Sequence, residues 1–263
     1  MLHSVRGLNN FSIGATDGAV GHVRDAYFDD QRWRLRYLVV QTGHWLGGRR
    51  VLISPLSLRG VDLAHRTLPT TLTKGQVAGS PDIDTDKPVS RQHELDFYRY
   101  YGFPYYWVSS EVADYLPYAA AAGVPGALSA IGFDTEWDRQ DVGDPHLQSI
   151  HAVTHYFVHA QDTDIGHVAD FLCDDSTWSI AYLVVATGAW WPGRKILVPE
   201  RWIEHVSWPA NTVDVGLDSE TVRRAPEYDR SALPSPEYLA RLAAYYARHA
   251  DRTSRSTAPL TVG

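Results

Sequence analysis

The sequence predicts a mainly β protein made of two tandem copies of one small β-barrel, each followed by a short helix and packed together as a pseudo-two-fold pair. Three observations lead to this prediction: an internal repeat, short strand-like runs separated by turn residues, and a helix-start pattern after each copy. The chain has 263 residues, which is enough for two small domains.

The internal repeat appears when the chain is shifted along itself by 145 residues, an offset that aligns the two halves without a gap. Identical pairs include Gly21/Gly166, His22/His167, Val23/Val168, Trp33/Trp178, Trp45/Trp190, Arg49/Arg194 and Tyr100/Tyr245. Roughly a quarter of about 100 paired positions are identical, which chance does not produce over an ungapped stretch. We interpret residues 1–101 as the first copy with its helix and 146–250 as the second.

Each copy alternates strand-like runs with turn residues. Residues 20–28 and 33–41 are rich in β-branched and aromatic side chains and flank a turn at 29–32, which predicts a hairpin. The remaining expected elements are strands at 50–54 and 67–68, a brief helix at 73–78, and second-copy strands at 165–173, 179–186 and 195–198. Several short strands that close on themselves predict a small barrel.

A helix is expected after each barrel, from Ser90 in the first copy and from Ser235 in the second. Ser235 with Pro236 and Glu237 combines an N-cap, a proline at the first helical position and an early acid. Residues 102–145 are rich in Pro, Gly, Ala and acids and are expected to form a linker, and 251–263 a disordered tail.

Three segments of the first copy resemble the PRC-barrel family: residues 17–23, 36–40 and 48–55. That family is named for the cytoplasmic domain of the photosynthetic reaction centre H subunit and includes the C-terminal domain of a bacterial ribosome maturation factor. The chain is similar to stand-alone tandem PRC-barrel proteins of bacteria. Both named relatives use the barrel to bind proteins, so the resemblance implies an adaptor surface and brings no catalytic residues.

The second copy departs from the family pattern in two places. Thr163 follows Asp162 where an Asp-Gly turn is expected, and Pro199 and Glu200 replace Ser54 and Pro55. Because threonine tolerates a positive φ poorly, the first turn of the second copy is expected to differ in type.

Composition argues against several classes of partner and location. A formal charge of −7 without a long Lys/Arg cluster makes nucleic-acid binding unlikely. No run approaches the roughly 18 apolar residues of a membrane span, so we expect no membrane insertion. The single cysteine, Cys173, is expected to be a small buried residue, and a cytoplasmic location follows.

The sequence predicts no enzyme, no cofactor and no metal site. His151, His155 and His159 recur at the spacing of a helix face, but alignment with the first copy places His151 in a short helical turn and His159 in a strand. The acidic pair Asp29 and Asp30, repeated at 174 and 175, is expected to serve turn formation.

The candidate partner-binding residues lie in and beside the Gly-rich connection of each copy. They are Trp45 and Arg49 in the first copy and Trp190 and Arg194 in the second. Trp and Arg are over-represented at binding hot spots. The alternative is that the repeated Trp caps its barrel or packs against the other copy. His22 and His167 are expected to face solvent, with a shared proton-handling role as the alternative.

These residues lead to a non-enzymatic protein-binding adaptor of the bacterial PRC-barrel type as the expected function, with one or more protein partners and, as an open alternative, homo-oligomer formation. The alternative function is an accessory role in electron or proton transfer, which the resemblance to the reaction centre H subunit implies. Fold analogy alone does not decide between them.

Overall fold

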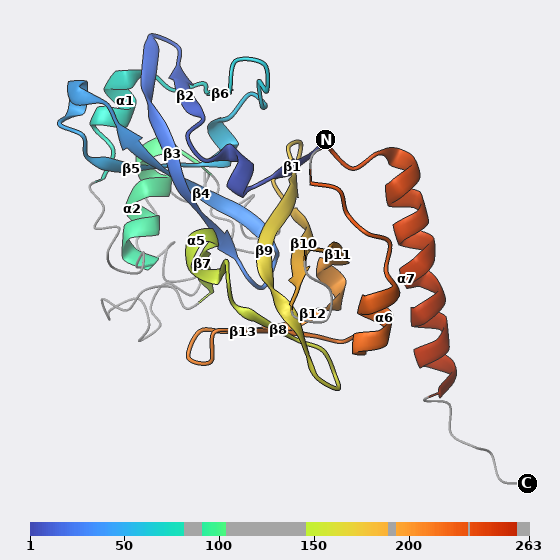
Figure 1. Cartoon of the computed structure of the whole chain (residues 1–263). Helices are drawn as coiled ribbons and strands as arrows, with labels where there is room; N and C mark the ends of the chain where they lie inside the picture. Colours follow the sequence, from blue (N-terminus) through green and yellow to red (C-terminus); the bar gives the residue numbers. More distant parts are fainter. Residues whose placement is uncertain (82–90, 104–145, 189–192, 231, 257–263) are drawn as a thin grey trace, which may run out of the picture. The chain divides into compact units, whose positions relative to one another are not determined.

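The computed structural model describes residues 1–81, 91–103, 146–188, 193–230 and 232–256 and shows a mainly β chain with two mixed sheets (Figure 1). The strands are β1 (Leu2–Ser4), β2 (Ser12–Ala15), β3 (Gly18–Asp29), β4 (Arg34–Thr42), β5 (Arg50–Ile53), β6 (Thr67–Pro69), β7 (Leu147–Ser149), β8 (Phe157–His159), β9 (Asp164–Asp174), β10 (Ile180–Thr187), β11 (Lys195–Pro199), β12 (Ile203–Ser207) and β13 (Thr212–Val215). The α-helices are α1 (Lys74–Ala78), α2 (Arg91–Tyr101), α5 (Ile150–Val153), α6 (Ser219–Arg224) and α7 (Pro236–Ser256).

The duplication is confirmed element by element, because each strand of the first copy has a counterpart about 145 residues later. The strand order is also the same in the two sheets: β5-β4-β3-β2-β6 in one and β11-β10-β9-β8-β13 in the other, where β12 adds a further strand. The pairs β2/β6 and β8/β13 are parallel. The expected strands and the brief helix α1 are therefore confirmed.

Neither sheet closes on itself within the described residues, so the two closed barrels that the sequence predicted are not confirmed. Beyond β6 and β11 the pairing among the described residues continues only through isolated bridges. Asp62 pairs with Thr67 and Leu58 with Thr70 beside β6, and Glu227 pairs with Ile196 of β11. What the structure shows is two open mixed sheets of one topology.

The compact units of the chain do not follow the repeat boundaries. One unit consists of Met1–Asn9, Asp25–Arg36 and Gln148–Gly263, and the other of Asn10–Arg24 and Tyr37–Leu147. The first unit therefore combines the second copy with the N-terminal segment and the hairpin tip of the first copy. The pseudo-two-fold packing of two whole copies stays a prediction.

The first unit is joined by short strands exchanged between the copies. β1 pairs with β9, with Leu2 opposite Asp174, and β7 pairs with β3. The buried carboxylate of Asp170 accepts hydrogen bonds from Ser4 Oγ (2.5 Å) and the backbone N–H of Arg6 (3.0 Å). At the equivalent positions Asp25 accepts from Ser149 Oγ (2.6 Å) and the N–H of His151 (3.0 Å). Because the same two bonds recur at the repeat offset, the exchange is reciprocal.

The hairpin tips of both copies also meet within this unit. The N–H of Leu35 donates to the carbonyl of Trp178 (2.9 Å), and the N–H of Ile180 donates to the carbonyl of Trp33 (2.6 Å). Both tryptophans adopt the left-handed region, with φ of 50° and 56°, which is uncommon for a bulky residue. Phe28 packs on Phe171 with ring centroids 5.4 Å apart. The tips thus form a small core of their own.

The trailing helices pack through their aromatic side chains. In the second unit α2 places Phe97 against Tyr37 with centroids 5.2 Å apart, and the Tyr37 hydroxyl donates to the buried carboxylate of Glu94 (2.8 Å). In the first unit the Tyr246 hydroxyl of α7 donates to the carbonyl of Leu197 on β11 (2.9 Å). None of the described helices combines the length and apolar character that crossing a bilayer requires.

The helix starts are mostly as the sequence predicts. Ser235 precedes α7, and its hydroxyl accepts from the N–H of Tyr238 (3.2 Å); Thr73 and Gln76 form a capping box on α1. The expected tail at 251–263 is wrong for its first part, because α7 continues to Ser256. Ser90, residues 104–145 of the expected linker and residues 257–263 lie outside the described residues.

A glycine substitution tests the close approach of β3 and β4. A Cβ on Gly21 would lie 2.1 Å from the carbonyl oxygen of Gln41, so Gly21→Ala should destabilise the fold by about 2 kcal/mol. Gly75→Ala in α1 is the control: the nearest atom is 3.8 Å away, and alanine favours a helix by about 1 kcal/mol. Urea denaturation measures both. Equal midpoints for the two variants would contradict the close approach.

The carboxylate that holds β1 gives a second prediction. Asp170→Ala should leave β1 paired only by its ladder, and amide protection across residues 2–8 should fall at least about tenfold in hydrogen exchange. Asp62→Ala is the control, because Asp62 is an exposed turn carboxylate that bonds His65. Unchanged protection of residues 2–8 in Asp170→Ala would show that the carboxylate does not hold the strand.

Candidate interaction surface

Trp45 packs on its own unit. It lies in the connection between β4 and β5 and is half-buried. Its indole Nε1 donates to the carbonyl of Val20 (2.8 Å), and the ammonium of Lys74 lies 4.5 Å from the ring centroid, a cation–π contact. These contacts agree with the alternative in which the tryptophan caps its own fold. A role in partner binding stays a prediction, and Trp190 lies outside the described residues.

Arg49 and Arg194 share one structural role, which explains why the arginine recurs. Arg49 Nη2 donates to the carbonyls of Ala78 (3.0 Å) and Ser80 (3.2 Å) at the end of α1. Arg194 donates to the carbonyls of Arg223 (2.8 Å) and Ala225 (2.6 Å) at the end of α6. The last carbonyls of a helix have no intrahelical partner, and a guanidinium at that end also complements the helix dipole.

The two repeated histidines occupy different surroundings. His22 on β3 is exposed, as expected. His167 on β9 is half-buried, and its ring stacks on that of His155 with centroids 6.1 Å apart. His155 replaces Asn10 of the first copy, and both adopt a positive φ, 83° and 65°. The shared proton-handling role stays a prediction.

His151, His155 and His159 do not share a helix face. His151 lies on α5, His155 follows that helix, and His159 ends β8, where it contacts Asp164. The prediction from the repeat alignment is confirmed for the elements. No group of three or more potential metal ligands occurs among the residues that the structure describes.

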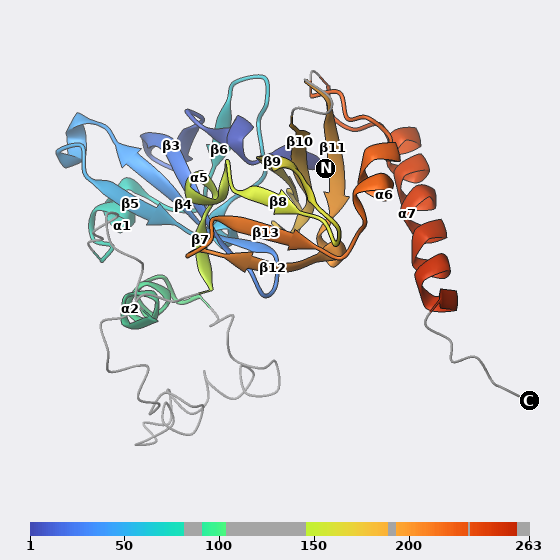
Figure 2. The same cartoon turned by 60° about the horizontal axis from the view of Figure 1, so that its bottom comes forward.

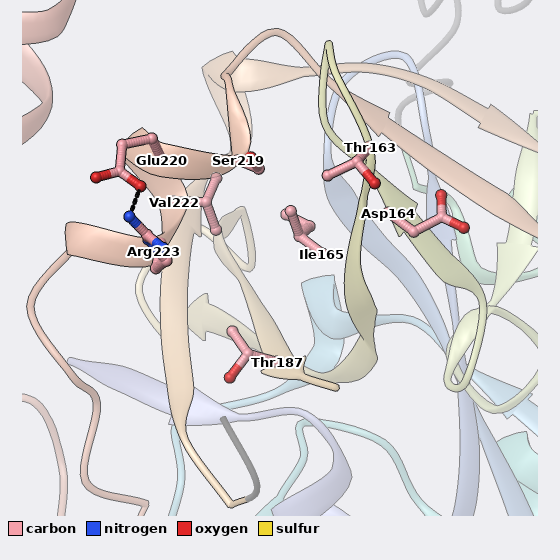
Figure 3. Close-up of a pocket in the computed structure, with 8 residues that line it drawn as sticks. All are labelled: Thr163, Asp164, Ile165, Thr187, Ser219, Glu220, Val222 and Arg223. Atoms are coloured by element: carbon pink, nitrogen blue, oxygen red, sulfur yellow. Dashed lines mark ion pairs between the residues drawn. The ribbon is translucent and has the colours of Figure 1, made fainter. Parts of the chain in front are cut away.

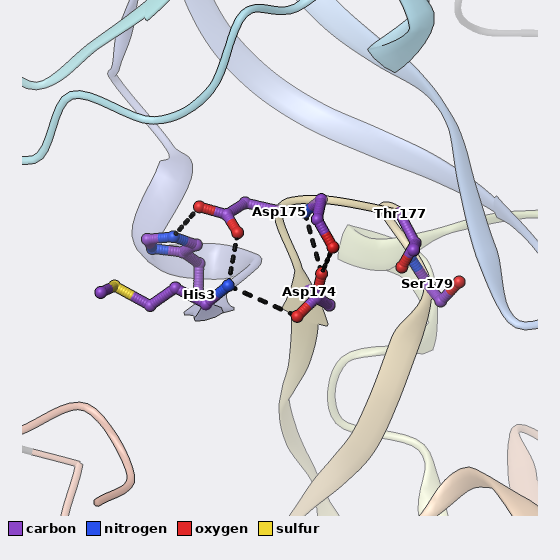
Figure 4. Close-up of polar contacts among 7 residues, drawn as sticks. His3, Asp174, Asp175, Thr177 and Ser179 are labelled. Carbon is purple, nitrogen blue, oxygen red and sulfur yellow. Dashed lines mark hydrogen bonds and ion pairs between the residues drawn. The ribbon is translucent and has the colours of Figure 1, made fainter.

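The acidic pairs form the hairpin turns, as predicted. Asp29 accepts from the N–H of Gln31 (3.0 Å), and Asp174 accepts from the N–H of Ser176 (2.9 Å). The second acid of each pair holds an exchanged strand instead. Asp175 lies 2.9 Å from Nε2 of His3, which is buried (Figure 4), and Asp30 accepts from the Gln148 amide at 2.9 Å. Sequence analysis missed His3, although its alignment with Gln148 marks a repeated polar position.

Asp29 has a further partner that the second copy lacks. Arg36 donates to its carboxylate at 2.7 Å, and both side chains are buried, whereas Ala181 occupies the position equivalent to Arg36. Burial alone would raise the pKa of Asp29, but the hydrogen bonds from Arg36 and from the backbone of Arg32 outweigh it and lower the pKa below its ordinary value.

An aromatic patch distinguishes the second copy. We define it by Phe157, His155, His167 and Trp208. Phe157 on β8 is 59% exposed and lies opposite His167 on β9, so their side chains point to the same face. Trp208, in the turn between β12 and β13, is 42% exposed. The backbone N–H of Phe157 donates to the carbonyl of Asn211 (3.0 Å), and the N–H of Asn211 donates to the carbonyl of Trp208 (3.2 Å).

The patch lies where β8, β13 and the β12–β13 turn run side by side (Figure 2). The first copy has Ser12 and Leu63 where the second has Phe157 and Trp208. No repeated sequence signal marks Phe157 or Trp208, because the two copies differ at both positions.

A pocket opens in the second copy between β9, β10 and α6 (Figure 3). It holds about 150 Å³ and is lined by Thr163, Asp164, Ile165, Thr187, Ser219, Glu220, Val222 and Arg223. Ile165 and Val222 are buried, and Glu220 pairs with Arg223 at the rim. The pocket therefore has an apolar floor and a charged edge.

The first turn differs between the two copies, as predicted. Gly18 has a φ of 136°, whereas Thr163 at the equivalent position has no positive φ.

Cys173, the single cysteine, is fully buried, and burial raises the pKa of its thiol, which agrees with the expected structural role.

A scan against protein-family models finds no match for the chain, and a search of curated proteins finds no relative. The class that fold and surface define is therefore a duplicated, mainly β chain with two sheets of one topology. Membership of the PRC-barrel family stays a prediction.

The lowered pKa of Asp29 predicts a pH dependence of stability. Because the native state keeps this carboxyl ionised below the pH at which the unfolded chain protonates it, Asp29 stabilises the fold above about pH 4. That contribution is lost as the pH falls through the lowered native pKa. Asp29→Asn, which removes the buried carboxylate that pairs with the buried Arg36, should cost about 3 kcal/mol near neutral pH.

The measurement is the free energy of unfolding of wild type and Asp29→Asn at about pH 7 and about pH 3. The difference between the two proteins should shrink at the lower pH. Asp96→Asn is the control, because Asp96 is exposed and its ion-pair partner Arg99 is exposed as well. A wild-type-to-variant difference that stays constant over this range would exclude a lowered pKa for Asp29.

Proposed function

We propose that the chain is a protein-binding adaptor and that the aromatic patch of the second copy is its partner-binding face. The observation that supports this proposal is the exposure of Phe157, a large aromatic on a regular strand, together with that of Trp208 in the turn to which the backbone of Phe157 is hydrogen-bonded. Clustered exposed aromatics on a rigid element are typical of protein interaction sites. A cytoplasmic location is part of the proposal.

The contacts of the arginines argue for this face over the Gly-rich connections. Arg49 and Arg194 donate to helix-end carbonyls of their own units, so binding through them would compete with those bonds. Binding through Phe157 and Trp208 would break no such hydrogen bond, because a partner that covers their exposed rings displaces only water. Burial of one aromatic side chain contributes about 2 kcal/mol.

The first copy supplies the matched variant for a test. The double variant Phe157→Ser, Trp208→Leu replaces both aromatics with the residues found at the equivalent positions, Ser12 and Leu63. Affinity capture from a native lysate with quantitative mass spectrometry should recover a stoichiometric protein with wild type. The double variant should lose it while retaining the wild-type circular dichroism spectrum.

Leu56→Ser is the control, because Leu56 is an equally exposed apolar side chain of the first copy, 59% accessible. It should retain the partner. A partner that the double variant still captures would place the interface elsewhere on the chain. Sedimentation velocity over a concentration series separates the homo-oligomer: self-association lost in the double variant would make the partner a second copy of the chain.

A further inference from the structure

Two imidazole rings lie stacked beside Phe157 in the aromatic patch. The rings of His155 and His167 have centroids 6.1 Å apart and an interplanar angle of 29°. His155 is exposed and His167 is half-buried. Phe157 lies directly opposite His167, where β8 and β9 run side by side (Figure 2). The patch therefore combines an exposed phenyl ring with a pair of groups that can take up protons.

The backbone holds this pair in place. The N–H of His155 donates to the carbonyl of Val168, and the N–H of Val168 donates to the carbonyl of Tyr156, both at 2.8 Å. His155 has a φ of 83°, a left-handed conformation in which histidine, asparagine and aspartate are enriched among the residues other than glycine. These two hydrogen bonds fix His155 against β9, the strand that carries His167.

The acids on the same face of the sheet are engaged by other histidines. The titratable groups on the surrounding elements are His151 on α5, His159 on β8, Asp164 on β9, Lys195 on β11, His205 on β12 and Asp214 on β13. His159 forms an ion pair with Asp164. Asp214 lies opposite both His159 and His205. Within the part of the chain that the structure describes, neither His155 nor His167 pairs with a carboxylate.

The first copy carries a permanent cation at the equivalent place. Asn10 stands where His155 does in the second copy, and it accepts a hydrogen bond from the guanidinium of Arg24 (2.6 Å). Ala169 replaces Arg24 in the second copy. Arginine stays charged at physiological pH, whereas imidazole ordinarily gains its proton only as the pH falls through about 6.5. The positive charge at this place is therefore fixed in the first copy and depends on pH in the second.

A protonated pair of stacked rings is stabilised by an anion. Two positively charged rings whose centroids are 6.1 Å apart repel each other. A carboxylate that accepts an N–H from each ring offsets this repulsion and forms two charge-assisted hydrogen bonds. An apolar group next to that carboxylate can at the same time cover the exposed ring of Phe157.

We propose that His155 and His167 bind a carboxylate of the protein partner, which docks on the aromatic patch with an acidic side chain next to an apolar one. This role of the two histidines rests on the proposed adaptor function and specifies the chemistry of its partner. Because a bound carboxylate favours protonated imidazole, the complex holds more protons than the separate proteins, and the affinity rises as the pH falls.

Phenylpropionate is a probe of this site that needs no identified partner, because it carries one carboxylate and one phenyl ring. Titration into the full chain, followed by two-dimensional NMR, should shift the amide signals of His155, Phe157 and His167. The affinity should be at least about tenfold higher at about pH 6 than at about pH 8. Phenylpropionamide has the same shape without the charge and should bind about tenfold more weakly at about pH 6. Equal affinity of the two compounds, equal affinity of the acid at both pH values, or no binding would overturn the carboxylate site.

The first copy supplies a matched variant and a control. His155→Asn introduces the residue of the equivalent position, and Asn10 adopts a positive φ there, so the fold should persist. This variant should bind phenylpropionate at least about fivefold more weakly at about pH 6. His22→Asn, which removes the repeated histidine of the first copy, should bind it as wild type does. An equal loss in both variants, or no loss in His155→Asn, would overturn the assignment to this pair.

Capture of the partner at about pH 6 and about pH 8 separates this site from the adaptor function. Recovery that is at least about tenfold higher at the lower pH supports both. A partner recovered equally at the two pH values would overturn the carboxylate contact and leave the adaptor function standing. Binding of phenylpropionate without any captured protein would support the carboxylate site and overturn the adaptor function.

Discussion

Two buried or half-buried aspartates hold the exchanged strands on which the first unit depends. Asp25 and Asp170 each accept one serine hydroxyl and one backbone N–H from the segment that the other copy contributes. Each also accepts the N–H of the residue that follows it, at 2.8 Å. A strand of three residues is too short to be stable alone, and charge-assisted hydrogen bonds are about twice as strong as neutral ones.

This arrangement explains why the compact units cross the repeat boundaries. The hairpin that carries the half-buried Asp25 and the hairpin that carries the buried Asp170 each receive two hydrogen bonds to that carboxylate from the N-terminal segment of the other copy. An unsatisfied buried carboxylate costs several kcal/mol. Neither hairpin tip can therefore be separated from the opposite segment without loss, and the chain between them must allow both exchanges.

The two copies share the contacts that fix their backbones and differ at positions outside the core. The close glycine contacts at Gly21 and Gly166 recur, each with a Cβ position 2.1 Å from a carbonyl oxygen, and so do the arginines at the helix ends. The two copies differ where no such constraint applies. Ser12 is replaced by Phe157 at the equivalent position of the second copy, and Lys74 by Ser219; none of these residues is buried in the core. New binding properties can arise at such positions without loss of the fold.

Much of the architecture was determined by the sequence alone. The repeat, the strands, the hairpin turns at the acidic pairs and the serine start of α7 follow from periodicity and local turn and capping chemistry, which act over a few residues. The sequence alone did not determine the roles of individual side chains. Recurrence marked Arg49 and Trp45 as candidates for binding, yet recurrence is equally the mark of a structural contact.

Only the tertiary structure decided whether a repeated residue makes a structural contact or is available for binding. It shows Arg49 at the end of α1 and Trp45 bonded to Val20, and it shows that β1 pairs with β9, a partner about 170 residues away in the chain. Such contacts depend on which segments meet after folding, and one sequence carries no local trace of them. For the same reason the exposed ring of Phe157 and the pocket beside Ser219 become visible only once the sheets are assembled.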